Sequence, residues 1–410
     1  MSRINLGIIF IVILTFLPGC GKGTKEGEPV NYFGGMGRTN SYEGYGSFYH
    51  KIFIVEDCKY KDSSGAITAP LVLPNSDYVI VNTRSNVLYI SKQIVKWAVK
   101  LDSGAIPAGC MAADGDLNIY IIATNGMLYS ISKDGQMRWN KLVEKTDKKL
   151  IVFSDLLAQK DGIVISVSNG EIYKFDFNGN IKWKFITGLS TTKTFASDDK
   201  GNLVIPLTHD LFGVTDTLLY LTPEGKVRWY KGFPKTRFYM TPVVCRHKIV
   251  IAGISEIKGN MLAEFYVLDE KGKKLWKKEL NVSPRFISVD EQGRIYAAGY
   301  NSGVGEALSE ILCFSASGKL EWKQYFQATV LSNLMLSRKF IAFVANDDKG
   351  SGVCFLDKDG KFEDVVSLQR APSIYSQPSV TSDPSVIFAG ADKLCIVRID
   401  ELPFDKLIPW

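Results

Sequence analysis

A short phrase recurs along the chain and limits what the chain can fold into. In its clearest copy, an apolar run at residues 218–221 is followed by a tight turn at 223–225 and then by Trp229, four residues after Gly225. The same interval joins Gly135 to Trp139, Gly179 to Trp183, Gly272 to Trp276 and Gly318 to Trp322. Self-similarity at a fixed period predicts a fold assembled from copies of one supersecondary unit.

Alignment of these copies on the apolar strand before the turn extends the repeat to eight units, spaced by 40 to 47 residues. One aligned position holds Tyr89, Tyr129, Tyr173, Tyr220, Tyr266, Cys313, Cys354 and Cys395. The strand after the turn carries Trp97, Trp139, Trp183, Trp229, Trp276 and Trp322. We interpret both sets as structural positions, with each tryptophan packed between neighbouring units, because aromatic side chains contribute large buried areas.

Each unit contains four strand signals separated by turns; in the first unit they fall within residues 67–101. Four-stranded units of this period close radially, so we predict an all-β fold, an eight-bladed β-propeller of four-stranded antiparallel blades, over residues 48–410. The last unit lacks a fourth strand of its own. We predict that residues 51–56 supply it and close the ring, and the competing hypothesis assigns this role to residues 406–410.

The N-terminal segment has the features of a secretory signal. Arg3 precedes an apolar run at residues 6–16, which is short for a membrane span and suits a signal-peptide core. The run ends in Leu-Pro-Gly-Cys at residues 17–20, which resembles the lipobox of bacterial lipoproteins. We therefore expect a signal peptide over residues 1–19, lipidation at Cys20 and a flexible tether over 20–47; the alternative is an ordinary secretory signal or an uncleaved anchor.

The titratable residues show no catalytic constellation. The three histidines, His50, His209 and His247, lie in turns or loops without a serine or cysteine nucleophile beside them, so we interpret them as solvated. The cysteines form no Cys-x-x-Cys pair, and those in the repeat are expected to be buried strand thiols. Aspartates in the turns, as at residues 114–116 and 198–202, suit turn chemistry better than a calcium site. We expect no metal and no cofactor.

The charge of the chain argues against nucleic acid as a partner. The sequence has 49 basic and 43 acidic residues, a net charge of +6, without a block of like charge. Proteins that bind nucleic acid usually concentrate basic residues on one face or along one segment.

The repeat resembles the PQQ-type propeller repeat, with its apolar strand, glycine turn and outer-strand tryptophan, over about residues 30–400. One branch of that superfamily, the quinoprotein alcohol dehydrogenases, implies a quinone, calcium and a carboxylate base. The other, the BamB-like lipoproteins, implies an eight-bladed scaffold that serves the outer-membrane β-barrel assembly machinery. The short loops, the absence of an adjacent cysteine pair and the lipobox favour the BamB-like branch.

Loops on a rigid scaffold often carry function. Three irregular stretches, at residues 209–217, 255–261 and 301–309, precede third strands and are expected on one face; Phe212, Met261 and Val304 are their candidate partner-binding residues. The sequence thus favours a non-enzymatic, monomeric scaffold anchored through lipid to the outer membrane or cell surface and binding protein partners. The alternative is a quinoprotein-like (PQQ-binding) oxidoreductase or a carbohydrate-binding sensor.

Overall fold

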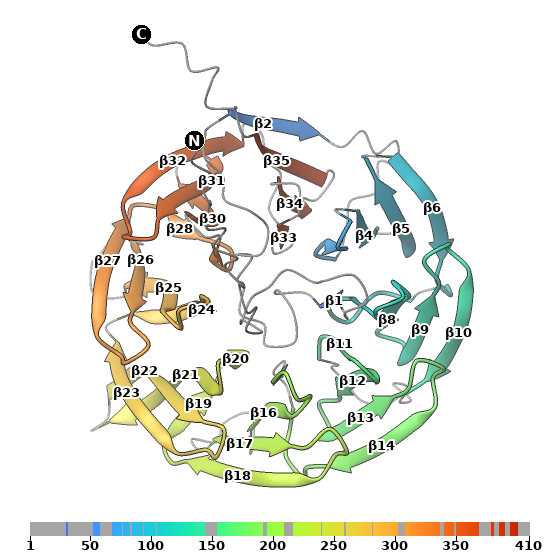
Figure 1. The fold of residues 1–410 in the computed structure, drawn as a ribbon, viewed down its shortest axis with the longest axis horizontal. Helices are drawn as coiled ribbons and strands as arrows, with labels where there is room; N and C mark the ends of the chain where they lie inside the picture. The colour runs from blue at the N-terminus through green and yellow to red at the C-terminus, as the bar shows by residue number, and fades with distance from the viewer. Residues whose placement is uncertain are drawn as a thin grey trace, which may run out of the picture.

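The computed structural model describes the residues 30–31, 52–57, 68–75, 77–82, 84–92, 94–103, 105–143, 154–191, 195–208, 216–238, 240–257, 260–280, 282–301, 308–336, 340–347, 350–368, 379–380, 385–389 and 394–400. In this part of the chain, the regular structure is entirely β-strand and is divided among eight antiparallel sheets. The sheets surround a common centre like the blades of a propeller (Figure 1). The predicted all-β propeller is confirmed. No described helix is long and apolar enough to cross a membrane.

We number the blades in chain order. The strands of blades 1 to 4 are β3 (Leu71–Val72), β4 (Tyr78–Val81), β5 (Asn86–Ser91) and β6 (Ile94–Lys100); β7 (Ala112–Ala113), β8 (Ile119–Ile122), β9 (Met127–Ile131) and β10 (Met137–Leu142); β11 (Leu157–Gln159), β12 (Gly162–Ser166), β13 (Glu171–Phe175) and β14 (Ile181–Ile186); and β15 (Ala196–Ser197), β16 (Leu203–Thr208), β17 (Asp216–Leu221) and β18 (Val227–Phe233).

In blades 5 and 7 the inner strand is split into two short strands. The strands of blades 5 to 7 are β19 (Thr236–Phe238), β20 (Val243–Cys245), β21 (Lys248–Ile257), β22 (Asn260–Asp269) and β23 (Lys274–Leu280); β24 (Ser283–Val289), β25 (Ile295–Asn301), β26 (Leu308–Phe314) and β27 (Leu320–Phe326); and β28 (Thr329–Val330), β29 (Met335–Leu336), β30 (Phe340–Asp347), β31 (Gly350–Asp357) and β32 (Phe362–Leu368).

Blade 8 joins the two ends of the chain. Its own strands are β33 (Ser379–Val380), β34 (Ser385–Ala389) and β35 (Leu394–Asp400), and its outer strand is β2 (Ile52–Asp57). β2 pairs with β35, from Ile52 opposite Asp400 to Asp57 opposite Cys395. Figure 1 shows β2 at the rim beside β35. The prediction that residues 51–56 complete the last blade is therefore confirmed. The segment of the competing hypothesis, 406–410, lies outside the described residues.

The segment expected to be a tether contributes to a sheet. The two-residue strand β1 (Val30–Asn31) pairs with β7, the inner strand of blade 2. The tether expected over residues 20–47 is thus in contact with the body of the propeller at this point, while its other residues lie outside the described ones.

The core lies between neighbouring blades rather than within one blade. In blade 4 every residue of β16 and β17 is buried, whereas the outer strand β18 alternates exposed and half-buried positions. One apolar cluster joins Tyr220 of blade 4 to Ile251 and Tyr266 of blade 5. Because burial of apolar surface favours folding in proportion to the area removed from water, each blade is stabilised mainly by its neighbours.

Each outer-strand tryptophan packs against the glycine of the next blade's turn. A Cβ atom placed on Gly225 would lie 2.7 Å from the Trp183 ring, and one on Gly135 would lie 2.7 Å from Trp97. Gly225 also has a φ of +76°, a conformation that side-chain-bearing residues rarely adopt. We call this contact the tryptophan–glycine dock.

The same turns accept a hydrogen bond from each indole. The Nε1 of Trp183 donates to the carbonyl of Pro223 at 2.8 Å, two residues before the cradling glycine. The other five bonds run from Trp97 to Lys133, Trp139 to Phe177, Trp229 to Glu270, Trp276 to Ala316 and Trp322 to Lys358. Six docks therefore link blades 1 to 7 in series.

The aligned position of the sequence repeat divides into two registers. Tyr220 lies opposite Trp229, but Tyr129 lies one residue away from the partner of Trp139, which is Ser130. Tyr89 and Cys313 share the register of Tyr220, whereas Tyr173 and Tyr266 share that of Tyr129. Because side chains alternate between the faces of a strand, the two groups point to opposite sides of their blades, so the single position expected from the sequence was wrong.

Replacing Gly225 by alanine tests the dock. The new Cβ would clash with Trp183 and strain the positive φ, so Gly225→Ala should lower the free energy of unfolding by about 1–3 kcal/mol. Gly232→Ala is the matched control, because Gly232 lies in the following strand with no atom within 4 Å of the added Cβ. Urea denaturation of the three proteins measures the difference, and equal midpoints for the two variants would contradict the role of the dock.

Candidate functional site

Blades 5 to 7 have longer second and third strands than blades 1 to 4. Their second and third strands are seven to ten residues long, against four to six residues in blades 1 to 4. In blade 5, β21 and β22 pair over ten positions, from Lys248 opposite Asp269 to Ile257 opposite Asn260. Since these strands are joined at the end opposite the docking turns, we call that end the hairpin face.

The three irregular stretches expected from the sequence lie where second and third strands end. Residues 255–257 and 260–261 belong to the paired strands β21 and β22, so the loop expected over 255–261 is instead the end of a long hairpin. The sequence signal for this hairpin is the short Lys258-Gly259 pair between two runs that contain β-branched and apolar residues. Met261 pairs with Glu256 in this hairpin, whereas Phe212 and Val304 lie outside the described residues.

A buried carboxylate anchors the blade 5 hairpin. Glu264 of β22 has an exposed fraction of 0% and forms an ion pair with Lys277 of β23. It also accepts hydrogen bonds from the hydroxyls of Ser255 and Tyr266. Thr236 on β19 lies 2.7 Å from Ser255, which extends the network to the inner strand. The network therefore connects four strands of the blade, β19, β21, β22 and β23.

The partners of Glu264 determine its ionisation. Burial alone would raise its pKa, but the hydrogen bonds from Lys277, Ser255 and Tyr266 outweigh burial and lower the pKa below its ordinary value. Burial, together with the hydrogen bond to Glu264, raises the pKa of Tyr266. Glu264 is thus a carboxylate and Tyr266 a neutral donor at neutral pH.

Related acids occupy the same place in two other blades. Glu171 of blade 3 pairs with Lys184 at 2.6 Å, and its pKa is lowered because hydrogen bonds from Lys184 and Tyr173 outweigh burial. Glu310 of blade 6 is also buried, but here burial prevails over the charge of Lys323 and raises its pKa. The sequence signal is a glutamate two or three residues before the aligned tyrosine or cysteine.

Aspartates in the turns between first and second strands are engaged in the turns themselves. Asp198 accepts hydrogen bonds from the backbone nitrogens of Lys200 and Asn202 and from the hydroxyl of Tyr220 at 2.6 Å. This is the turn chemistry expected from the sequence. Among the described residues, no group of three or more His, Cys, Asp or Glu side chains could hold a metal ion.

The described cysteines and histidine have structural surroundings. Cys313 and Cys354 are free and buried, as expected, and burial raises the pKa of each thiol to about 12. Cys110 is free, whereas Cys245 is disulfide-bonded. The ring of His247 is 64% exposed and lies 2.6 Å from Glu270. His50 and His209, like Cys20 and Cys58, lie outside the described residues.

Removal of Lys277 should reverse the pH dependence that Glu264 contributes. In the native protein the pKa of Glu264 is lowered, so its contribution to stability is present above the unfolded pKa of about 4.3 and is lost as pH falls through the lower, folded pKa. In Lys277→Met the buried carboxylate lacks its cation and its pKa rises. The variant should lose about 2–4 kcal/mol at pH 7 and recover part of it towards pH 4.

The control is Lys278→Met, which changes the exposed neighbour of Lys277 on the same strand. Urea denaturation between pH 4 and pH 8 separates the outcomes. If Lys277→Met and Lys278→Met lose the same stability with the same dependence on pH, Glu264 is not held as a carboxylate by Lys277.

Residues 263–400 match a family described as outer membrane protein assembly factor BamB. Similar solved structures include BamB from Moraxella catarrhalis (15% identity, TM-score 0.60, 86% of this chain and 100% of that one), the Dos1 propeller (12%, 0.59, 86% and 95%) and Saccharomyces cerevisiae Sqt1 (12%, 0.58, 87% and 100%). No curated protein matches the sequence.

Because every sequence identity is low, these similarities in structure establish the fold alone. The family match covers blades 6 and 7, the strands β33 to β35 of blade 8, and most of the third strand and the fourth strand of blade 5. The repeats within residues 263–400 therefore match the PQQ-type β-propeller repeats of the BamB family, and the tryptophan–glycine docks show that blades 1 to 4 share the same local construction.

Proposed function

We propose that this protein is a lipid-anchored, extracytoplasmic propeller that acts as a protein–protein interaction scaffold in the bacterial envelope, in the assembly of outer-membrane proteins. The observation that carries the proposal is the overlap of two features. The long hairpins of blades 5 to 7 lie within residues 248–357, and the match to the BamB family covers residues 263–400. The part of the chain that resembles an assembly factor therefore overlaps the part with the long second and third strands.

The hairpin face suits a protein partner because it combines rigidity with reach. Antiparallel pairing over seven to ten positions fixes the backbone of each hairpin, and the network around Glu264 fixes the base of the longest one. Preorganised backbone reduces the entropy lost on association. Phe212, Met261 and Val304, in or beside the connections of blades 4 to 6, are the residues proposed to contact the partner.

The proposal contains no catalytic step. It is supported by the raised pKa of the buried Cys313 and Cys354 thiols and by the aspartates that are engaged in their turns. It places the protein as a monomer, attached to the outer membrane or cell surface through lipid at Cys20, with protein partners and without nucleic acid. The support for the anchor is the lipobox-like sequence at residues 17–20.

Site-specific photocrosslinking in cells tests the partner-binding face. A photoreactive amino acid at position 212, 261 or 304 should give one common crosslinked protein. Positions 271 and 319, exposed in the docking turns of blades 5 and 6 at the opposite end of the disc, are the controls. Crosslinks of equal yield from both ends, or different products at each test position, would refute a shared binding face.

Metabolic labelling with a fatty acid tests the anchor. The native protein should incorporate the label, and Cys20→Ser should not, because it removes the proposed lipidation site. Equal labelling of the two proteins would exclude lipid at Cys20 as the attachment.

A further inference from the structure

A polar pair recurs where each blade faces the next, at the end of the disc with the docking turns. A tyrosine in register with the outer-strand tryptophan donates its hydroxyl to an aspartate in the turn between first and second strands. The pairs are Tyr89 with Asp77 (2.6 Å), Tyr120 with Asp114 (2.7 Å), Tyr220 with Asp198 (2.6 Å) and Tyr296 with Asp290 (2.9 Å). In blade 3, Lys174 and Asp161 form an ion pair at 2.6 Å instead.

Blade 5 lacks both members of this pair. The residues in register with Trp276 are Val250 and Val267, where blades 2 and 6 have Tyr120 and Tyr296 on the second strand. The turn has no aspartate: Arg246 and His247 form it, both with positive φ, at 46° and 62°. In blade 7, the buried ring of Phe355 lies opposite Asp364, which takes the place of the outer-strand tryptophan.

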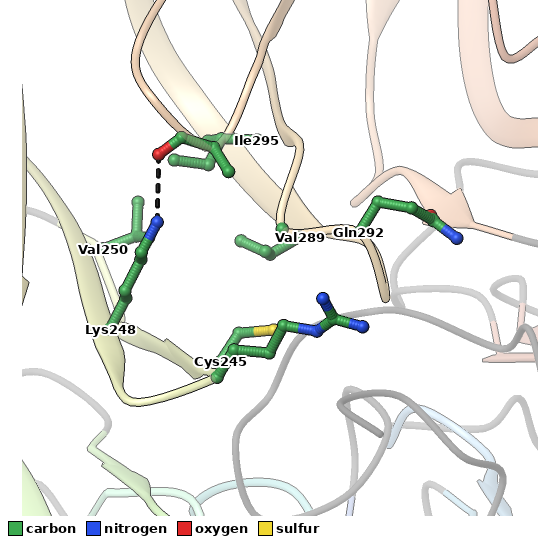
Figure 2. Close-up of a pocket in the computed structure, with 9 residues that line it drawn as sticks. Cys245, Lys248, Val250, Val289, Gln292 and Ile295 are labelled. Carbon is green, nitrogen blue, oxygen red and sulfur yellow. Dashed lines mark hydrogen bonds between the residues drawn. The ribbon is translucent and has the colours of Figure 1, made fainter. Parts of the chain in front are cut away.

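A cavity of about 140 Å³ lies where the side chains are missing. Figure 2 shows Cys245, Lys248 and Val250 of blade 5 on one side and Val289, Gln292 and Ile295 of blade 6 on the other. A cavity of about 150 Å³ lined by apolar side chains is large enough for benzene. The volume therefore matches one aromatic ring.

The mouth of this cavity is cationic. Lys248 donates from Nζ to the backbone carbonyl of Ala316 at 3.0 Å. The indole of Trp276 donates to the same neutral acceptor. In blade 6 the corresponding residue is Arg294, and its Nε donates instead to the carboxylate of Asp290 at 2.7 Å. Lys248 thus presents a charge at the place where a neighbouring blade holds a carboxylate.

We propose that this cavity binds an aromatic carboxylate, with the ring in the place of the missing tyrosine and the carboxylate in the place of the missing aspartate. The ring packs against Val250, Val289 and Ile295. The carboxylate accepts charge-assisted hydrogen bonds from Lys248. The ligand is either a free aromatic acid or an acidic–aromatic segment of a protein, and the site does not depend on the function proposed above.

Titration of the purified protein with small probes tests the site. 4-Fluorophenylacetate, followed by fluorine NMR, should bind with a Kd below about 5 mM, as expected for a ligand of this size. Acetate lacks the ring and 4-fluorobenzyl alcohol lacks the charge, so each should bind at least about ten-fold more weakly. An end-blocked Gly-Asp-Phe-Gly peptide distinguishes the sources: tighter binding of the peptide indicates a protein segment, and weaker binding a free acid.

Two variants connect the binding to this cavity. Val250→Phe puts a ring where Tyr120 and Tyr296 lie and should abolish binding, and Lys248→Met should weaken it at least about ten-fold. Lys278→Met is the control and should bind as the native protein does. If Val250→Phe does not fold, Lys248→Met decides. The proposal is overturned if neither 4-fluorophenylacetate nor the peptide binds, or if the folded variants bind them as the native protein does.

Discussion

The structure depends on an indole ring held between two blades. Each ring closes a gap that only glycine leaves open, and its nitrogen satisfies a carbonyl of the same turn. A blade alone could not bury the faces of its sheet, so its stability comes from its neighbours. The dock makes the spacing between neighbours specific, because both the ring and the turn must be in place for the contact to form.

The series of docks ends at blade 7. Position 364 in blade 7 holds an aspartate where the other outer strands have tryptophan, and blade 8 takes its outer strand from the N-terminal side of the chain. Backbone pairing between β2 and β35 therefore closes the ring, whereas side-chain docks join blades 1 to 7.

The sequence was sufficient for the repeat and for closure because both depend on local patterns. A glycine in a turn, a tryptophan four residues later and a strand-like run at residues 51–56 without a partner of its own are visible without knowledge of contacts. Register was less predictable, because the turn between Tyr129 and Gly135 is one residue longer than that between Tyr220 and Gly225. The Glu264 network and the blade 5 cavity depend on which side chains face one another across strands and between blades. The spacing of residues in the sequence does not reveal these contacts.

The features proposed to carry function lie where the repeat changes. The long hairpins of blades 5 to 7 and the missing tyrosine–aspartate pair of blade 5 are departures from a scaffold that the other blades share. Hydrogen exchange of the backbone amides tests the underlying account directly. If tryptophan–glycine docks hold blades 1 to 7 together, the amides of β2, β34 and β35 should exchange together and faster than those of β17 and β22. Equal protection of the closing blade and the docked blades would contradict it.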